Sequence, residues 1–282
     1  MRLTPEDHDR DAVGRKHVYP VVSRRARGVS VGVNLNTNQA CNWRCVYCQV
    51  PGLVRGKAPE VDLELLAREL HEFLDELFSP GWLERHAPPE ARRVNDLALS
   101  GNGEPTLSPQ FEGAVECMAR ELERRELVGR VRLILITNGS GVFTPGVQAG
   151  LARMASVGGE VWFKLDGAQD STLARVNDVR TSVELQRKRL LETARLCPTW
   201  VQTIALDFEG PSPSVSERVA YADLLSGVLA EGVSLRGVLL YGLARESHQP
   251  EAARLRSLPV EDLEAFGALV RERTGLEVRV SP

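Results

Sequence analysis

Three cysteines lie close together in the sequence, at Cys41, Cys45 and Cys48, with the spacing C-x3-C-x2-C. They directly follow the apolar run 29–36, which predicts a strand, so one loop at the carboxyl end of that strand would gather three thiolates. Thiolates are ligands for iron and for zinc. A cubic 4Fe-4S cluster has four irons, so three cysteine ligands leave one iron free to bind another molecule.

Zinc is the alternative metal for this loop, because three cysteines need one further ligand to complete a tetrahedron. Structural zinc sites usually space their ligands as one pair followed by a second pair, and no second pair follows Cys48. The next histidine, His71, lies in a segment with helical periodicity. We therefore favour an iron–sulfur cluster over zinc, and over three buried cysteines without a metal.

A glycine-rich turn, Ser100-Gly101-Asn102-Gly103-Glu104-Pro105, follows the predicted strand 94–99. Together with the cysteines it resembles the radical S-adenosylmethionine superfamily, whose signature is C-x3-C-x-aromatic-C followed by a Gly-Gly-Glu-Pro turn. Tyr47 stands at the aromatic position. Asn102 stands where the second glycine often lies, and Asn can also adopt the left-handed conformation that glycine would provide. The resemblance covers about residues 29–250.

The resemblance implies a 4Fe-4S cluster on the three cysteines and S-adenosylmethionine at the open iron. It implies that Glu104 accepts a hydrogen bond from the methionine ammonium, that Tyr47 lies against the adenine, and that Lys164 binds the methionine carboxylate. Asp166 and Asn138 would contact the ribose. The implied cofactor-binding residues are Tyr47, Gly101, Asn102, Gly103, Glu104, Asn138, Lys164 and Asp166.

Each of these assignments has a structural alternative. The glycine-rich turn can be a tight strand-to-helix connection begun by Pro105, and Tyr47 can be a core aromatic. Lys164 and Asp166 are two positions apart on a predicted strand and point to the same side, so they can form a buried ion pair. Asn138, which precedes Gly139, can simply cap a turn. No catalytic residue beyond the cluster ligands is assigned.

Strand-like and helix-like segments alternate along the chain and would position these residues. The predicted strands are 29–36, 94–99, 131–136, 161–166, 200–206 and 233–241, and the predicted helices are 62–78, 109–126, 146–156, 182–196, 214–229 and 260–274. This alternation predicts a parallel α/β sheet, either doubly wound or barrel-like. Both motifs follow strand ends, as in barrels, and the resemblance implies a partial (β/α)6 TIM-like open barrel, which we predict.

The predicted organisation has three parts: an N-terminal arm over 1–28, a core barrel over 29–250, and a C-terminal helix and short strand over 251–282 that pack on the core. The proline- and charge-rich segment 82–93 is expected at the surface. The densest basic cluster lies at 15–27, directly after three acidic residues, and is expected to be a solvated arm or a contact for phosphate.

The composition excludes several classes of protein. The formal charge of −3 and the pI of about 6.0 exclude a globally basic nucleic-acid binder. No run of eighteen apolar residues and no signal-peptide pattern appears, so we expect a cytoplasmic protein without a membrane segment. The chain has five cysteines, an odd number, and Cys117 and Cys197 are isolated. A disulfide framework is therefore not expected.

We predict a radical S-adenosylmethionine enzyme that forms a 5′-deoxyadenosyl radical and abstracts hydrogen from an RNA base or a small metabolite. A low-potential donor such as flavodoxin or ferredoxin would supply the electron. The chain resembles most closely a group of compact proteins related to tRNA wyosine synthases and to activating enzymes. An activase that makes a glycyl radical on a partner protein is the first alternative. A non-catalytic iron–sulfur or zinc-binding module is the second.

Overall fold

Eight strands form one curled sheet that makes up the framework of the chain. The computed structural model describes residues 2–4, 14–23, 28–209 and 213–282. In spatial order the strands are β1 (Val18–Ser23), β2 (Gly28–Val33), β5 (Val94–Leu99), β6 (Arg132–Thr137), β7 (Glu160–Lys164), β8 (Thr199–Ile204), β10 (Gly237–Tyr241) and β12 (Val278–Ser281). Every neighbouring pair from β2 to β12 is parallel, whereas β1 pairs antiparallel with β2. The predicted partial α/β barrel is confirmed.

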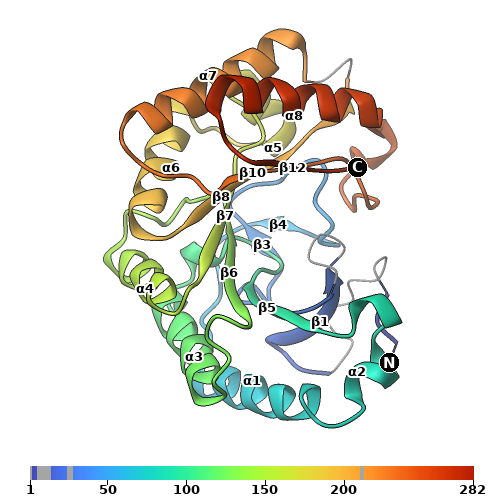
Figure 1. Ribbon diagram of the computed structural model, residues 1–282, viewed down its shortest axis with the longest axis vertical. Coiled ribbons are helices and arrows are strands. Elements are labelled where there is room, and N and C mark those ends of the chain that lie inside the picture. Colours follow the sequence, from blue (N-terminus) through green and yellow to red (C-terminus); the bar gives the residue numbers. More distant parts are fainter. Residues whose placement is uncertain (1, 5–13, 24–27, 210–212) are drawn as a thin grey trace.

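Helices cover the convex side of this half barrel (Figure 1). They are α1 (Leu63–Leu77), α2 (Trp82–His86), α3 (Phe111–Arg124), α4 (Pro145–Ser156), α6 (Val183–Leu196), α7 (Val215–Ala230) and α8 (Val260–Thr274). A further helix, α5 (Asp170–Asn177), instead packs against the segment that carries the cysteines, where Val176 belongs to the same apolar cluster as Trp43. Asp62 caps α1, because its carboxylate accepts from the backbone N–H groups of Glu64 and Leu65 at 3.0 Å. The apolar faces of the helices and the convex face of the sheet form the main core.

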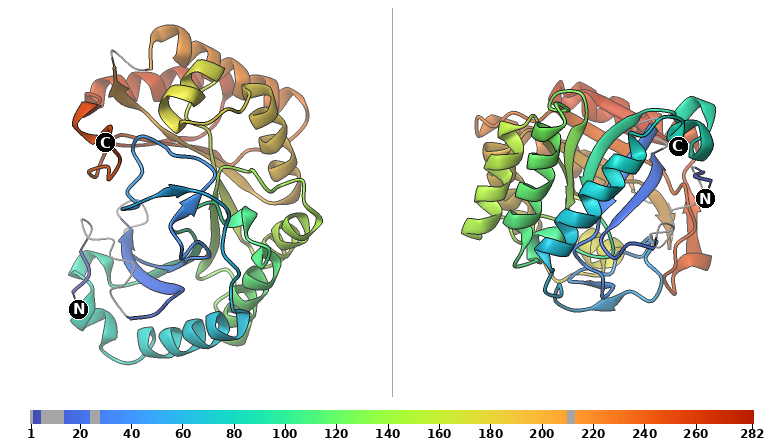
Figure 2. Two further views of the ribbon diagram at one scale, coloured as in Figure 1. Left: turned by 180° about the vertical axis from the view of Figure 1, so that it is seen from behind. Right: turned by 90° about the horizontal axis from the view of Figure 1, so that it is seen from below.

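Two small pairs of strands flank the half barrel. β3 (Ala40–Cys41) pairs with β4 (Val54–Arg55), and β9 (Leu206–Phe208) pairs with β11 (Leu255–Ser257). Three 3₁₀ helices lie at Pro89–Ala91, Pro105–Leu107 and Ala252–Arg254. The view from behind in Figure 2 shows the blue β3–β4 segment on the concave side of the sheet. Among the described residues, no helix is long and apolar enough to span a lipid bilayer.

The prediction of an arm over residues 1–28 is wrong for Val18–Ser23. These residues form β1, and their side chains are buried because the strand lies against β2. The basic cluster lies partly outside the described residues, since Arg24, Arg25 and Arg27 are not described, and neither are the acidic residues at 7, 9 and 11. Arg15 pairs with Glu76. The interaction of this cluster with phosphate stays a prediction.

Two further segments are more deeply integrated than the sequence indicated. β12 is a member of the main sheet, parallel to β10, rather than a strand packed on a completed core. The segment 82–93 is not a surface insertion throughout, because Trp82 is only 6% exposed. Its ring meets the Phe73 ring edge-on, with centroids 5.9 Å apart. A single large aromatic therefore ties this polar segment to α1.

We expect Trp82→Ala to lower the free energy of unfolding by about 3–5 kcal/mol, the usual cost of truncating a buried aromatic. Urea denaturation followed by circular dichroism measures it. Phe78→Ala is the matched control, because the Phe78 side chain is 42% exposed and should change stability by about 0.5 kcal/mol or less. Equal losses in the two variants would contradict the burial of Trp82.

Candidate functional site

A cavity of about 640 Å³ lies on the concave side of the half barrel. It is lined by all three predicted cluster ligands and by seven of the eight predicted cofactor-binding residues: Cys41, Cys45, Cys48, Tyr47, Gly101, Asn102, Gly103, Glu104, Asn138 and Lys164. Asp166 is the one that does not line it. The segments that follow β2, β5 and β6 and the end of β7 therefore converge, as expected at the carboxyl ends of parallel strands.

The cysteine loop presents its sulfurs to this cavity. Cys45 is 9% exposed, and Cys41 and Cys48 are partly exposed. The Asn177 Nδ2 donates to Cys45 Sγ at 3.3 Å, and the Trp43 N–H donates to Cys41 Sγ at 3.5 Å. Burial raises the pKa of Cys41 to about 12 and that of Cys45 to about 11. These thiols are therefore protonated at neutral pH and must release protons when they bind a metal.

The three thiols face one cavity, and a single metal ion and a cluster make different demands on such a donor set. Among the described residues, no group of three His, Cys, Asp or Glu side chains is arranged to hold one ion. Ligands of a single zinc ion must all converge on one point, about 2.3 Å from each sulfur. Ligands of a cube each bind a different iron, so they need no common point. Three thiols facing one cavity are compatible with a cube that has one open iron.

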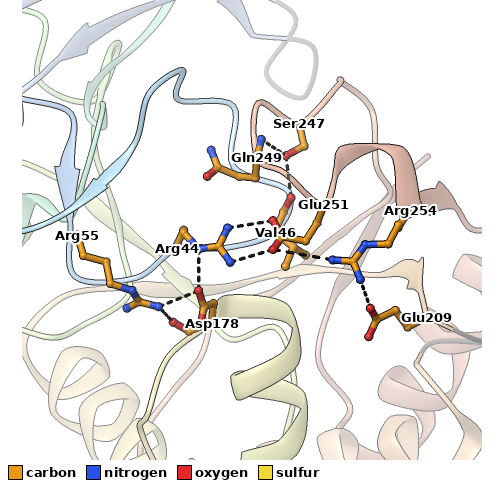
Figure 3. A network of polar contacts seen from close by, with 9 residues as sticks. All are labelled: Arg44, Val46, Arg55, Asp178, Glu209, Ser247, Gln249, Glu251 and Arg254. Atoms are coloured by element: carbon orange, nitrogen blue, oxygen red, sulfur yellow. Dashed lines mark hydrogen bonds and ion pairs between the residues drawn. The ribbon is translucent and has the colours of Figure 1, made fainter.

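Two distant segments hold the cysteine loop through Arg44 (Figure 3). The Arg44 guanidinium donates from Nε to Asp178 at 2.7 Å and from both terminal nitrogens to Glu251 at 3.0 and 2.8 Å. The Arg44 N–H also donates to the Asn177 carbonyl at 3.2 Å. Arg55 pairs with the same Asp178 carboxylate at 2.9 Å. Bidentate pairing of this kind fixes direction as well as distance.

The segment 247–251 also binds the backbone of the loop. Ser247 Oγ donates to the Val46 carbonyl at 2.7 Å, and Gln249 Nε2 donates to the carbonyls of Cys48 at 3.3 Å and Val50 at 3.1 Å. A loop without regular structure must pair its buried carbonyls in this way. Sequence reasoning missed Ser247, Gln249 and Glu251, since they lie far along the chain in a stretch without periodicity.

The glycines of the turn are required by close approach rather than by a left-handed backbone. A Cβ on Gly101 would collide with Asn34, and one on Gly103 would collide with the Ala40 carbonyl and Asn36. Gly101, Asn102 and Gly103 are absent from the residues with positive φ, so the conformational interpretation of Asn102 is wrong. The Asn102 N–H donates to Asn34 Oδ1 at 3.2 Å. Asn34 therefore fixes the turn from the neighbouring strand end.

Glu104 is buried, at 3% exposed, and joins the turn to β6. Its Oε1 accepts from the Thr106 N–H at 3.1 Å, from the Thr106 hydroxyl at 2.5 Å and from the Thr137 hydroxyl. Its Oε2 accepts from the Asn138 N–H at 2.6 Å. Burial raises the pKa of Glu104, and these hydrogen bonds oppose that rise. Oε1 accepts from three donors and Oε2 from one, so Oε2 is the oxygen with an acceptor position left.

Tyr47, Lys164 and Asp166 form one hydrogen-bonded chain. Lys164 Nζ donates to the Tyr47 hydroxyl at 2.7 Å, and that hydroxyl donates to Asp166. Asp166 also accepts from Asn177 Nδ2 at 2.6 Å and from the Ile204 N–H at 3.0 Å. Asp166 thus lies behind Tyr47, where it positions the phenol. Its predicted ribose contact stays a prediction. The Tyr47 hydroxyl lies between the Lys164 ammonium and the Asp166 carboxylate, so the two charged groups are joined through the phenol.

The charge states of this chain follow from burial and from neighbouring charges. Burial acts to lower the pKa of Lys164, but Tyr241, Asp166, Cys45 and Cys48 outweigh it, so the pKa is raised and the ammonium persists. Burial raises the pKa of Tyr47 well above its usual value, so the phenol stays neutral. The cavity therefore presents the Lys164 ammonium beside the cysteine loop.

Asn138 lines the cavity but is also engaged in a turn. Its Nδ2 donates to Asn42 Oδ1 at 3.1 Å, and its Oδ1 accepts from the Ser140 N–H at 3.0 Å. The second contact is the predicted turn cap. The first links the turn after β6 to the cysteine loop, because Asn42 directly follows Cys41. Asn138 therefore connects the two motifs.

Solved structures share this parallel half barrel at low sequence identity, which shows a common fold. A structure described as TYW1, a wyosine synthase, with a lysine–pyruvate adduct bound has this fold: the TM-score is 0.54 at 13% identity, over 88% of this chain and 74% of that chain. The radical enzyme OxsB with aqua-cobalamin and S-adenosylmethionine bound aligns with a TM-score of 0.46 at 13% identity, over 69% of this chain and 26% of that one. Neither models of known families nor curated proteins give a match.

We expect Glu251→Ala to loosen the cysteine loop, because Arg44 loses a bidentate partner that is 8% exposed. Hydrogen bonds to charged groups contribute about 1.5–3 kcal/mol, so amide exchange in peptide 41–50 should accelerate about tenfold or more. Hydrogen–deuterium exchange with mass spectrometry measures this rate. The control is Glu246→Ala, a solvent-exposed residue of the same loop. Equal exchange in both variants would show that the loop does not depend on Glu251.

Proposed function

We propose that the chain is a radical S-adenosylmethionine enzyme that holds a 4Fe-4S cluster through Cys41, Cys45 and Cys48. One observation carries the proposal: a three-cysteine loop and a glycine-rich turn, distant in sequence, line one cavity of the half barrel. When bound, the cluster and cofactor together supply reductive cleavage to methionine and a 5′-deoxyadenosyl radical that abstracts hydrogen from the substrate. A low-potential protein such as flavodoxin or ferredoxin would deliver the electron.

The residues of the chain would bind and orient the methionine end of the cofactor. The Lys164 ammonium would pair with the carboxylate, and the remaining acceptor position on Glu104 Oε2 would take the ammonium. The missing side chains of Gly101 and Gly103 let the turn lie against Asn34 and the Ala40 carbonyl, close to the cysteine loop. Trp43 and Val46, each 2% exposed, pack beneath the loop and exclude water from that side.

Lys164 is better suited to binding a carboxylate than to forming a covalent adduct. The TYW1 structure is described with a lysine–pyruvate adduct, and a lysine attacks a carbonyl only after it loses its proton. The raised pKa of Lys164 opposes that loss. We therefore assign Lys164 to the cofactor and do not transfer the adduct chemistry to this chain.

Anaerobic reconstitution followed by dithionite and S-adenosylmethionine tests the proposal. We expect a brown protein with about four irons per chain and release of 5′-deoxyadenosine. Cys45→Ala should abolish both, whereas Cys117→Ala, an isolated half-buried cysteine on α3, should retain both. A colourless preparation, a single zinc per chain, or nucleoside production by Cys45→Ala would refute the proposed function.

Asn177 should tune the potential of the cluster, because its amide donates to Cys45 Sγ at 3.3 Å. Donors to a cluster sulfur stabilise the more negative reduced state. We expect Asn177→Ala to lower the midpoint potential by up to about 59 mV, which is a tenfold change for a one-electron couple.

A redox titration monitored by electron paramagnetic resonance measures this shift. The control is Asn38→Ala, because the Asn38 side chain bonds the Lys57 carbonyl and the Ala40 N–H rather than a cysteine sulfur. This variant should leave the potential unchanged. An unchanged potential in Asn177→Ala would contradict the tuning role.

A further inference from the structure

The cavity extends well beyond the residues assigned to the cofactor. Its far part is lined by β1, β2, β5 and β12. The inward side chains Ser30 of β2 and Ala98 of β5 are small there, as is Ser100 directly after β5, whereas the bulky Trp162 lies two strands further along the sheet, on β7. Small residues on one wall therefore leave a space that bulky residues fill elsewhere in the half barrel. The proposed cofactor contacts use none of this space.

One carboxylate lies in this part of the cavity. Asp96 is 2% exposed, lines the cavity, and is paired in register with Ser30, whose hydroxyl donates to it. In the part of the chain that the structure describes, Asp96 takes part in no ion pair. The nearby Arg132 guanidinium binds Glu160 instead, at 3.3 Å. Burial raises the pKa of Asp96 to about 6, against the opposing effects of Ser30 and Arg132.

Asp96 is separated from the proposed cofactor contacts. It precedes Leu99, the end of β5, by three residues, which is about 10 Å of strand. The glycine-rich turn begins just beyond that end. The cavity thus has the Lys164 ammonium at one end and the Asp96 carboxylate in its far part, which we call the floor of the cavity. A ligand deep in the cavity meets the carboxylate, while the cofactor lies at the strand ends.

We propose that this far part of the cavity is the substrate subsite and that Asp96 and Ser30 bind a protonated amine or guanidine group of a small-molecule substrate. A buried carboxylate without a cation is costly, and a cationic donor offsets that cost by a charge-assisted hydrogen bond. Phosphate or carboxylate groups are repelled from the same floor. The inference rests on the proposed function, since it names the substrate class of that cavity.

Calorimetric titration of the anaerobically reconstituted protein at pH 7.5 tests this subsite. The probes are cadaverine and agmatine, with 1,5-pentanediol as the uncharged match. We expect both amines to bind and the diol not to bind, and we expect Asp96→Asn to weaken amine binding at least tenfold. Asp223→Asn, which removes an exposed carboxylate from α7, should keep the amine affinity within twofold of wild type.

Several outcomes would overturn the subsite. They are the absence of amine binding, equal binding of the diol, and equal amine affinity in Asp96→Asn. A further outcome is that a short single-stranded RNA binds in an Asp96-dependent way while amines do not bind. That result would assign Asp96 to a nucleobase and refute the proposal of a small-molecule substrate. Release of 5′-deoxyadenosine in the same preparation reports the proposed function separately. Nucleoside formation without amine binding therefore overturns the subsite alone.

A stability measurement separates a ligand-binding role from a structural one. If Asp96 is retained for a ligand, Asp96→Asn removes an uncompensated charge, and the melting temperature of the ligand-free protein at pH 8 should rise. A fall in melting temperature, or failure to fold, would indicate a structural role and overturn the proposal. Ser30→Ala provides a second variant, because it keeps the carboxylate and removes one donor. We expect it to weaken amine binding two- to fivefold.

Discussion

The site depends on holding an irregular loop still. The connection between β2 and α1 that carries the cysteines has only the two-residue strands β3 and β4, whose short pairing cannot fix where all three sulfurs lie. Contacts from outside the loop do this instead: Arg44 binds Asp178 and Glu251, and Gln249 binds the carbonyls of Cys48 and Val50. Preorganisation of this kind is what a metal site requires before any ligand arrives. The C-terminal third of the chain is thereby tied to the motif near its start.

Three buried carboxylates in the half barrel differ in the hydrogen-bond donors around them, and these donors determine what each carboxylate does. Glu104 is satisfied by donors from the turn and from the end of β6, so it joins two elements. Asp166 is satisfied by Tyr47, Asn177 and the Ile204 N–H, so it positions a phenol. Asp96 has the Ser30 hydroxyl and a cavity before it. The same chemical group therefore joins two elements, positions a neighbouring side chain, or is a candidate for binding a ligand, depending on the donors around it.

The shape of the cavity follows from side-chain size on the concave face. Ala98, Ile134, Trp162, Trp200 and Leu239 form an apolar cluster separate from the main core. The two indoles fill one side of the half barrel, and the short side chains of β2 and β5 leave the other side open. A closed barrel would fill this interior by packing from all strands. Here β1 and β12 are the two edges of an open sheet, and both line the cavity.

The sequence by itself determined the alternation of strands and helices and the two motifs that line the cavity, because periodicity and short motifs are local properties of the chain. The partial barrel followed from the resemblance that those motifs carry. The tertiary structure alone decided that Val18–Ser23 pair as a strand, that Trp82 is buried, that Asp166 lies behind Tyr47, and that residues 247–251 bind the cysteine loop. These features depend on which distant backbone and side-chain groups meet. A local sequence pattern does not predict these contacts, because the partners are far apart in the chain. They form hydrogen bonds or pack together only once the sheet has curled.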